Sequence, residues 1–187
     1  GAAPRPAIKD AGLPWELGIA ETHQTLILNG LRTRVRIESD SKLLSGRDVA
    51  ISCMLGAEEF GFGTSLLMTM GCVMMRVCNL DTCPMGICTQ NPELRKHFHG
   101  KPEYIINYLT FVAQELREYM AKLGIRTRDE LVGRTDLLHV KPAPADSRMS
   151  KMDLDCILHN PAIVNINVHF QKAYTYDFHL EDTLDMK

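Results

Sequence analysis

The sequence has no apolar run of membrane-spanning length, no signal-peptide pattern and no charge excess of one sign. Its 187 residues carry 21 Lys and Arg against 23 Asp and Glu, a net charge of -2. A near-neutral balance gives no electrostatic basis for binding nucleic acid or an anionic membrane. We therefore expect a cytoplasmic protein whose partners include neither nucleic acid nor a membrane.

The length suffices for one modest hydrophobic core, or for one domain with a tail. The first residue is Gly rather than Met. We therefore expect a fragment of a longer protein or a processed product.

The chain has six cysteines, and four of them lie within the segment GCVMMRVCNLDTCPMGICTQ. Cys72, Cys78, Cys83 and Cys88 follow the spacing C-x5-C-x4-C-x4-C, and Pro84 directly follows the third. A Cys-Pro step ends many iron–sulfur ligand runs, and such clusters need several thiolates that converge from an irregular loop. The surrounding Asn, Asp, Thr, Pro and Gly residues favour a loop. The pattern favours an iron–sulfur site.

Three other interpretations stay open on spacing alone. Structural zinc sites use paired C-x2-4-C knuckles, which this segment lacks. Disulfides suit small secreted domains, and nothing else in the chain reads as secreted. Buried free cysteine is common and fits Cys53 and Cys156, each alone in an apolar context. It explains four clustered cysteines less well.

The rest of the first half alternates between helical and extended patterns. We predict a loop at 1–16, helices at 18–29, 46–55 and 65–70, and strands at 33–39 and 57–62. Ser45 and Gly56 mark the ends of the second of these helices, and His23 reads as a packed residue on the first. The order of helices and strands with short links predicts an α/β fold in which crossover helices join parallel strands.

A weaker motif, Gly61-x-Gly63-Thr64, stands where the second strand leads into a helix. Backbone N–H groups at such a junction can bind a phosphate, although glycines also serve ordinary tight turns. Further along, we predict a short helix that starts at Asn91 and Pro92, a longer helix at 102–123, a short helix capped by Thr127, and a linker at 141–150. A strand at 163–170 and a helix at 178–186 are weakly patterned.

The residues then point to a family. The segments LPWELGIAETHQTLILNGLRTRVRIESD, SGRD, LGAEEFGFGTSLLMTMGCVMMRVCNLDTCPMGICTQNPELRKHF and DELVGRTDLL resemble the large subunit of glutamate synthase. The likeness runs nearly continuously to about residue 138. It implies that residues 1–140 are the C-terminal half of an FMN-binding (β/α)8 TIM-type barrel with the iron–sulfur loop at 72–88. Residues 151–187 would lead into a C-terminal β-helix domain.

The resemblance also implies chemistry. The family makes glutamate from 2-oxoglutarate and glutamine-derived ammonia, using FMN and a [3Fe–4S] cluster. Its electrons come from a small subunit or from ferredoxin. Its ligand pattern C-x5-C-x4-C falls on Cys72, Cys78 and Cys83, and Cys88 falls where the family needs no ligand.

The family's FMN phosphate loops match Asp40, Ser41 and Lys42, together with Gly61, Gly63 and Thr64. The first loop typically reads Asp-Gly-Gly, so Ser41 and Lys42 are departures. A Cβ can block a left-handed conformation or a close backbone approach, and Lys42 could supply a compensating ammonium.

Three hypotheses follow from these residues. The first is the flavin and cluster region of glutamate synthase. The second is a non-catalytic iron–sulfur electron-transfer or interaction module with weakened flavin binding, and the third is a related FMN barrel acting on another amine. Because a half barrel leaves open sheet edges, we expect the isolated chain neither to fold stably nor to catalyse.

Overall fold

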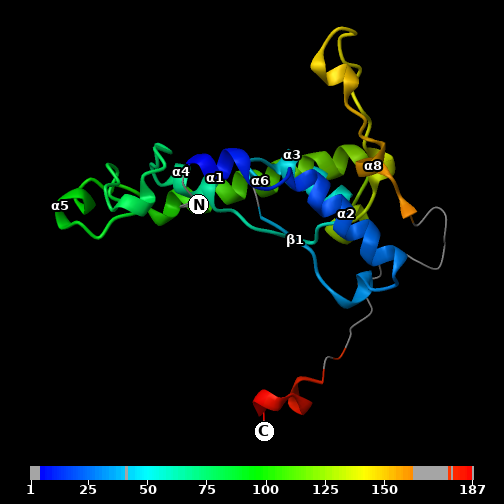
Figure 1. The fold of residues 1–187 in the computed structure, drawn as a ribbon, viewed down its shortest axis with the longest axis horizontal. Coiled ribbons are helices and arrows are strands. Elements are labelled where there is room, and N and C mark those ends of the chain that lie inside the picture. The colour runs from blue at the N-terminus through cyan, green and yellow to red at the C-terminus, as the bar shows by residue number, and fades with distance from the viewer. Residues whose placement is uncertain (1–4, 41, 162–176, 178, 187) are drawn as a thin grey trace.

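The computed structural model describes residues 5–40, 42–161, 177 and 179–186 (Figure 1). Helices dominate these residues, and two short strands form one sheet. The elements in chain order are α1 (Arg5–Asp10), α2 (Trp15–Leu28), η1 (Arg32–Arg34), β1 (Glu38–Ser39), α3 (Gly46–Leu55), β2 (Glu59–Phe60), α4 (Thr64–Thr69), η2 (Cys78–Leu80), α5 (Pro92–Arg95), α6 (Pro102–Leu123), α7 (Arg128–Leu131), η3 (Thr135–Leu137), η4 (Arg148–Lys151), α8 (Asp155–Leu158), η6 (Leu180–Asp182) and η7 (Leu184–Met186).

Local capping signals set most helix ends. Ser45 Oγ accepts a hydrogen bond from the Asp48 N–H at the start of α3, which ends at Gly56. Thr127 caps α7 in the same way. Gly124 adopts the left-handed conformation that ends α6. The predicted helices α2, α3, α4, α5, α6 and α7 are confirmed to within a few residues.

The predicted strands are shorter than expected. Residues 32–34 form the 3-10 helix η1, and only Glu38–Ser39 and Glu59–Phe60 pair as strands. They pair in parallel, as predicted, with Glu38 opposite Glu59. The described residues are therefore mostly helical with a single parallel strand pair, which is compatible with part of an α/β fold.

The predicted loop at residues 1–16 is wrong for part of its length. Residues 5–10 form α1, with Pro6 in its first turn, where a missing N–H leaves no helical hydrogen bond unmade. Helix α2 begins at Trp15, directly after Pro14. Proline therefore starts helices here.

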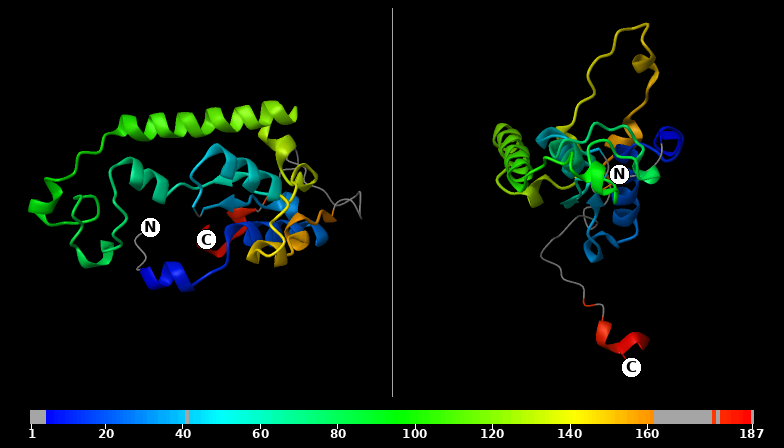
Figure 2. Two further views of the ribbon diagram at one scale, coloured as in Figure 1. Left: turned by 90° about the horizontal axis from the view of Figure 1, so that it is seen from above. Right: turned by 90° about the vertical axis from the view of Figure 1, so that its left-hand side faces the viewer.

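Helix α6 runs along the molecule and packs against α3 and α4 (Figure 2). Gly46 permits the closest approach, because a Cβ at this residue would lie 2.6 Å from the Val112 carbonyl oxygen. The Gly46 N–H donates to Glu115 Oε2 at 2.7 Å, so a side chain of α6 caps α3. One core cluster joins these helices to α7, and its members are Ala50, Cys53, Met54, Met120, Leu131 and Val132.

A second core cluster lies between α2 and the strand pair, beside a buried ion pair. Arg32 is 1% exposed, and its Nη2 lies 2.7 Å from Glu58 Oε2. Arg32 also donates to His23 Nδ1 at 3.0 Å and to the Gly56 and Val35 carbonyls. The network links α2, the end of α3 and the start of β2. His23 is therefore a packed core residue, as predicted.

The chain's last part is described in pieces. Residues 141–147 lack helix and strand, and η4 begins at Arg148, inside the range predicted as a linker. The predicted strand at 163–170 lies outside the described residues. In the predicted helix at 178–186, the described residues 180–182 and 184–186 form 3-10 turns. No helix in the described part of the chain combines the length and apolarity needed to cross a membrane.

Candidate metal centre

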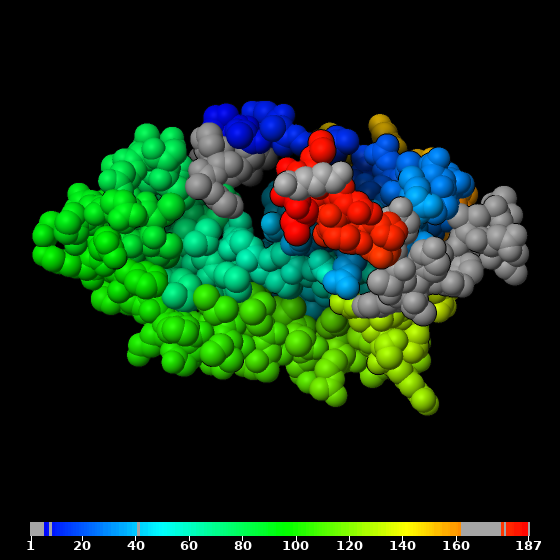
Figure 3. All heavy atoms as spheres, turned by 90° about the horizontal axis from the view of Figure 1, so that it is seen from below, coloured from blue at the N-terminus to red at the C-terminus, as the bar shows by residue number. Residues whose placement is uncertain are grey.

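The four clustered cysteines lie on one irregular segment between α4 and α5, which we call the cysteine loop (residues 71–91). It forms one end of the molecule together with α5 (Figure 3). Its only helical turn is η2, and Met74, Arg76 and Asp81 have positive φ values of 57°, 61° and 57°. The loop prediction is confirmed, and this backbone turns repeatedly without forming regular hydrogen-bonded structure.

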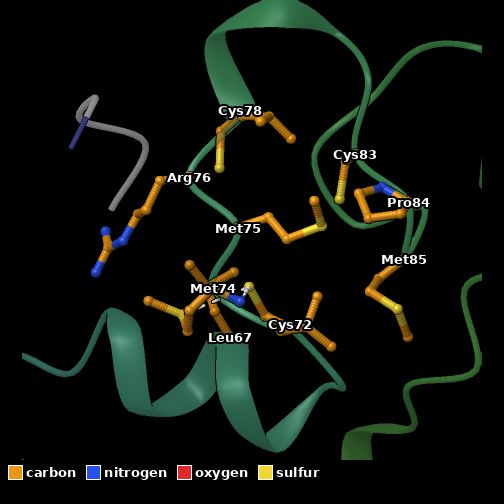
Figure 4. Close-up of a pocket in the computed structure, with 11 residues that line it drawn as sticks. Leu67, Cys72, Met74, Met75, Arg76, Cys78, Cys83, Pro84 and Met85 are labelled. Atoms are coloured by element: carbon orange, nitrogen blue, oxygen red, sulfur yellow. Dashed lines mark hydrogen bonds between the residues drawn. The ribbon is translucent and has the colours of Figure 1, made fainter.

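Cys72, Cys78 and Cys83 line one pocket with the Leu67, Met75 and Met85 side chains (Figure 4). Figure 4 shows the three sulfurs facing a common space, with Met75 between them. Cys83 is buried, whereas Cys72 and Cys78 are half-buried. The structure therefore brings together the three thiols that the sequence resemblance selected, although they come from different local structures.

Cys83 lies in a turn that presents backbone N–H groups to its sulfur. Desolvation by burial raises the pKa of the Cys83 thiol. Hydrogen bonds from the N–H groups of residues 85–88 lower it by more, so the pKa of Cys83 lies below its usual value. A thiolate is the form that ligates a metal. N–H donors around a ligating sulfur also suit the hydrogen bonding that tunes iron–sulfur clusters.

The fourth thiol, Cys88, belongs to the same group. It is exposed on the surface of the cysteine loop. Desolvation and the neighbouring charge of Cys78 raise the pKa of Cys88, and Cys83 and Cys72 act in the same direction over a longer range. Cys88 therefore lies within electrostatic reach of the other three thiols.

The spacing of the sulfurs bears on the choice of metal. Within the part of the chain that the structure describes, no three cysteine sulfurs lie within 4.8 Å of one another. A single tetrahedral zinc ion with Zn–S bonds of about 2.3 Å would bring its sulfurs to about 3.8 Å. In a cluster each thiolate binds a different iron atom, so the sulfurs stand farther apart. Several thiolates that converge from an irregular loop are the donor set of an iron–sulfur cluster.

Several contacts fix the far side of the loop to α5. Gly86 has a φ of 69°, and a Cβ at this residue would collide with the Leu94 carbonyl oxygen and lie 3.1 Å from the Phe98 nitrogen. His97 Nδ1 lies 3.0 Å from the Pro84 carbonyl oxygen.

A carboxylate closes the base of the same loop. Asp81 accepts from the Thr89 hydroxyl at 2.8 Å and from the Gln90 N–H at 2.7 Å. The hydrogen bonds from Gln90 and Thr89 lower the pKa of Asp81. Sequence reasoning missed Asp81, Gly86 and His97 as positioning residues. Only the Pro-x-Gly turn at 84–86 hinted at the role of Gly86.

The two predicted phosphate loops meet at the carboxyl ends of the strands. The Gly61 N–H donates to the Ser39 carbonyl at 2.9 Å, and a Cβ on Gly61 would lie 2.7 Å from the Asp40 side chain. Asp40, Lys42 and Gly63 are exposed, and Thr64 is half-buried at the start of α4. Ser41 lies outside the described residues. Lys42 has a φ of 53°, a conformation that favours glycine.

Two buried hydroxyls flank this strand edge without partners. Among the described residues, Ser39 Oγ beside Asp40 and Ser65 Oγ beside Thr64 make no hydrogen bond. The side chains are 1% and 4% exposed. Buried hydroxyls normally find a partner. The exposed backbone at Gly63 beside this edge fits a polar group such as a phosphate.

The remaining cysteines differ from each other. Cys53 is fully buried, and burial raises the pKa of its thiol to about 12, so it is an inert core residue, as predicted. Cys156 is exposed, so its interpretation as a buried cysteine is wrong. It lies on the short helix α8 at the surface, where the apolar sequence around it does not enclose it.

Comparison with known proteins places the chain. A family model described as the conserved region in glutamate synthase matches residues 1–126. The chain is 58% identical over 162 residues to "Glutamate synthase [NADPH] large chain" of Bacillus subtilis (strain 168), covering 86% of this chain and 11% of that protein. It is 57% identical over 158 residues to "Glutamate synthase [NADH]" of Schizosaccharomyces pombe (strain 972 / ATCC 24843), covering 84% and 7%.

The likeness extends to a third kind of relative. "Ferredoxin-dependent glutamate synthase 1, chloroplastic/mitochondrial" of Arabidopsis thaliana is 42% identical over 190 residues, covering 98% of this chain and 12% of that protein. The chain thus spans about a tenth of the length of these relatives. The chain belongs to the glutamate synthase family.

Proposed function

We propose that this chain is the cluster-binding and flavin-binding part of a glutamate synthase. The enzyme would be an oxidoreductase that reduces 2-iminoglutarate, formed from 2-oxoglutarate and glutamine-derived ammonia, to L-glutamate. The observation that carries the proposal is the convergence of Cys72, Cys78 and Cys83 on one pocket, with backbone N–H groups directed at Cys83.

In this proposal, Cys72, Cys78 and Cys83 hold a [3Fe–4S] cluster. Asp40, Ser41, Lys42, Gly61, Gly63 and Thr64 form the phosphate-binding edge for FMN. When bound, the cluster would supply single-electron transfer, and FMN would supply the reduction of a carbon–nitrogen double bond.

The chain's own residues do the positioning. The adjacent ends of β1 and β2 would lie at the carboxyl-terminal face of a (β/α)8 barrel, where such barrels bind phosphate. The half barrel would comprise residues 1–140 and the linker residues 141–150. Residues 151–187 would lead into a β-helix domain. Other domains of the enzyme complete the site.

The electron donor is left open by this part of the enzyme. The relatives' names include NADPH-, NADH- and ferredoxin-dependent enzymes. An electron-donating small subunit or ferredoxin therefore belongs to the proposal as a class of partner.

A second function is favoured by one observation at the phosphate edge. Lys42 takes a left-handed conformation that an L-residue adopts only with strain. If this weakens FMN binding, the chain is a non-catalytic iron–sulfur electron-transfer or interaction module.

The deciding experiment is anaerobic purification of the protein expressed from its complete reading frame, with iron, sulfide and flavin analysis and EPR. The expected result is a three-iron EPR signal, bound FMN and loss of the signal in Cys78→Ser. The matched control is Cys156→Ser, which changes an exposed thiol outside the loop and should keep the signal.

Other outcomes separate the candidates. Iron with no flavin would favour the electron-transfer module. Protein without iron, or with zinc alone, would refute both.

A further inference from the structure

A second cavity, which we call the Arg95 cleft, lies between the cysteine loop and the segment that begins with α5. Its volume is about 350 Å³, which is within the range of small-molecule sites. It shares no lining residue with the pocket that the three cysteines line. The residues that line the cleft are Gly86, Ile87, Thr89, Gln90, Arg95 and Phe98.

Packed turns of the backbone form the walls of this cleft. The Phe98 N–H donates to the Arg95 carbonyl oxygen at 3.2 Å, so one turn carries both residues. A Cβ on Gly86 would lie 3.1 Å from the Phe98 nitrogen, which shows that the cysteine loop touches this turn. The shape of the cleft therefore depends on backbone contacts and does not need a particular side-chain rotamer.

Two polar side chains in the lining are available to a ligand. Among the described residues, neither the Arg95 guanidinium nor the Gln90 carboxamide has a hydrogen-bond or ion-pair partner. The Thr89 hydroxyl and the Gln90 N–H are already bound to the Asp81 carboxylate, at 2.8 and 2.7 Å. Asp81 does not itself line the cleft. The free groups are thus a cation and an amide.

The charge of the lining selects an anion. Arg95 is the only charged residue that lines the cleft. The next cation, Lys96, is paired with Glu93 at 2.6 Å and lies outside the lining. A guanidinium presents parallel N–H donors that match the two oxygens of a carboxylate. Because the lining holds one cation, it suits a single carboxylate better than a doubly charged anion.

We propose that the Arg95 cleft binds an organic monocarboxylate that has a flat apolar part. The carboxylate pairs with the Arg95 guanidinium and accepts a hydrogen bond from the Gln90 carboxamide. The apolar part lies against the Phe98 ring and the Ile87 side chain, which are the apolar members of the lining. This site goes beyond the proposed function, because its residues hold neither the cluster nor FMN in that proposal.

The test titrates the protein expressed from its complete reading frame with para-fluorobenzoate and follows the ligand by fluorine NMR. A ligand of this size should bind with a dissociation constant of about 1 mM. Inorganic phosphate should displace it poorly, since phosphate has no apolar part. No saturable binding below about 20 mM, or equal binding of phosphate, would overturn the inference. Neither result bears on the iron and flavin analysis that tests the proposed function.

Three variants tie the binding to this cleft, even if para-fluorobenzoate also binds elsewhere in the enzyme. Arg95→Gln should weaken binding at the cleft at least about tenfold, because it removes a charged hydrogen-bond donor. Arg95→Lys should weaken it less, because it keeps the charge but loses the planar fork. The matched control is Lys96→Gln, which should stay within about twofold of the parent because it removes an exposed cation outside the cleft. Arg95 is exposed, so its variants should fold. An Arg95→Gln variant that binds as the parent does would overturn the inference.

Discussion

Gly86 is the residue at which a small change should most directly test how the cluster site is positioned. Its φ of 69° is unfavourable for an L-residue. The atoms nearest to an added Cβ are backbone atoms of Leu94, Arg95 and Phe98. Backbone atoms cannot rotate away as a side chain can. Gly86→Ala should therefore push the turn that surrounds Cys83 away from α5.

The expected magnitude has two parts. The left-handed conformation costs an L-residue about 1–2 kcal/mol. Forcing extra volume into a packed contact costs about 1–3 kcal/mol more. Gly71 allows the conformational cost to be measured apart from the packing cost, because its φ is 96° and nothing lies within 4 Å of an added Cβ. Gly71→Ala should show the conformational part alone.

The assay is competition for the cluster iron by a chelator. The chelator concentration that removes half of the iron should fall about 30-fold to more than 1,000-fold for Gly86→Ala. It should fall about 5- to 30-fold for Gly71→Ala. Equal losses in the two variants would show that the contact with α5 does not position the turn, and the reasoning would be refuted.

The other predictions concern the core and the phosphate edge. Arg32→Met leaves the buried Glu58 carboxylate without its cation and should destabilise the fold by about 3–5 kcal/mol. Arg32→Met with Glu58→Met should destabilise the fold less than the sum of the two single variants, while still losing the hydrogen bonds from Arg32 to His23 and to two carbonyls. Hydrogen exchange in α3 and β2 would measure this, and an additive double variant would contradict it. Burial lowers the pKa of His23 from 6.5 to about 4, and the charge of Arg32 is the second cause of this shift. The native state therefore binds fewer protons than the unfolded state between these values, and up to about 3 kcal/mol of stability should be lost as the pH falls from about 6.5 to 4. His23→Gln, whose side-chain oxygen can still accept from Arg32, should flatten that dependence in a urea-midpoint series, and an unchanged slope would exclude His23 as its cause. Lys42→Gly should raise the retained FMN about fivefold by removing about 1 kcal/mol of strain, whereas a fall would show that the Lys42 ammonium holds the phosphate.

The sequence predicted those parts of the fold that depend on neighbouring residues. Ser45, Asn91 and Thr127 each accept a hydrogen bond from an N–H two or three residues ahead, so their side chains alone mark the helix starts. The loop character of the cysteine segment was equally local. The family resemblance, and not the local sequence, selected three ligands from the four cysteines. These three cysteines line one pocket.

Contacts between distant segments could not be predicted in this way. Thr33 and Arg34 were predicted as part of a strand, but they lie in η1, which begins at the buried Arg32 that binds His23, Gly56 and Glu58. A propensity pattern gives way when a tertiary contact of this kind competes with it.

The positions of the cysteines in the cysteine loop likewise depend on contacts that the local sequence does not reveal. Val73, Met75 and Leu80 are 56%, 60% and 61% exposed, so apolar burial contributes little to this segment. Cys72 follows α4, Cys78 begins η2, and Cys83 lies in the turn held by α5. Each thiol is thus positioned by a different short element, with few contacts between them. A cluster that bonds to all three would cross-link these elements, because metal–ligand bonds replace the packing that the loop lacks. The loop's order and its proposed electron-transfer role would then depend on the same bonds.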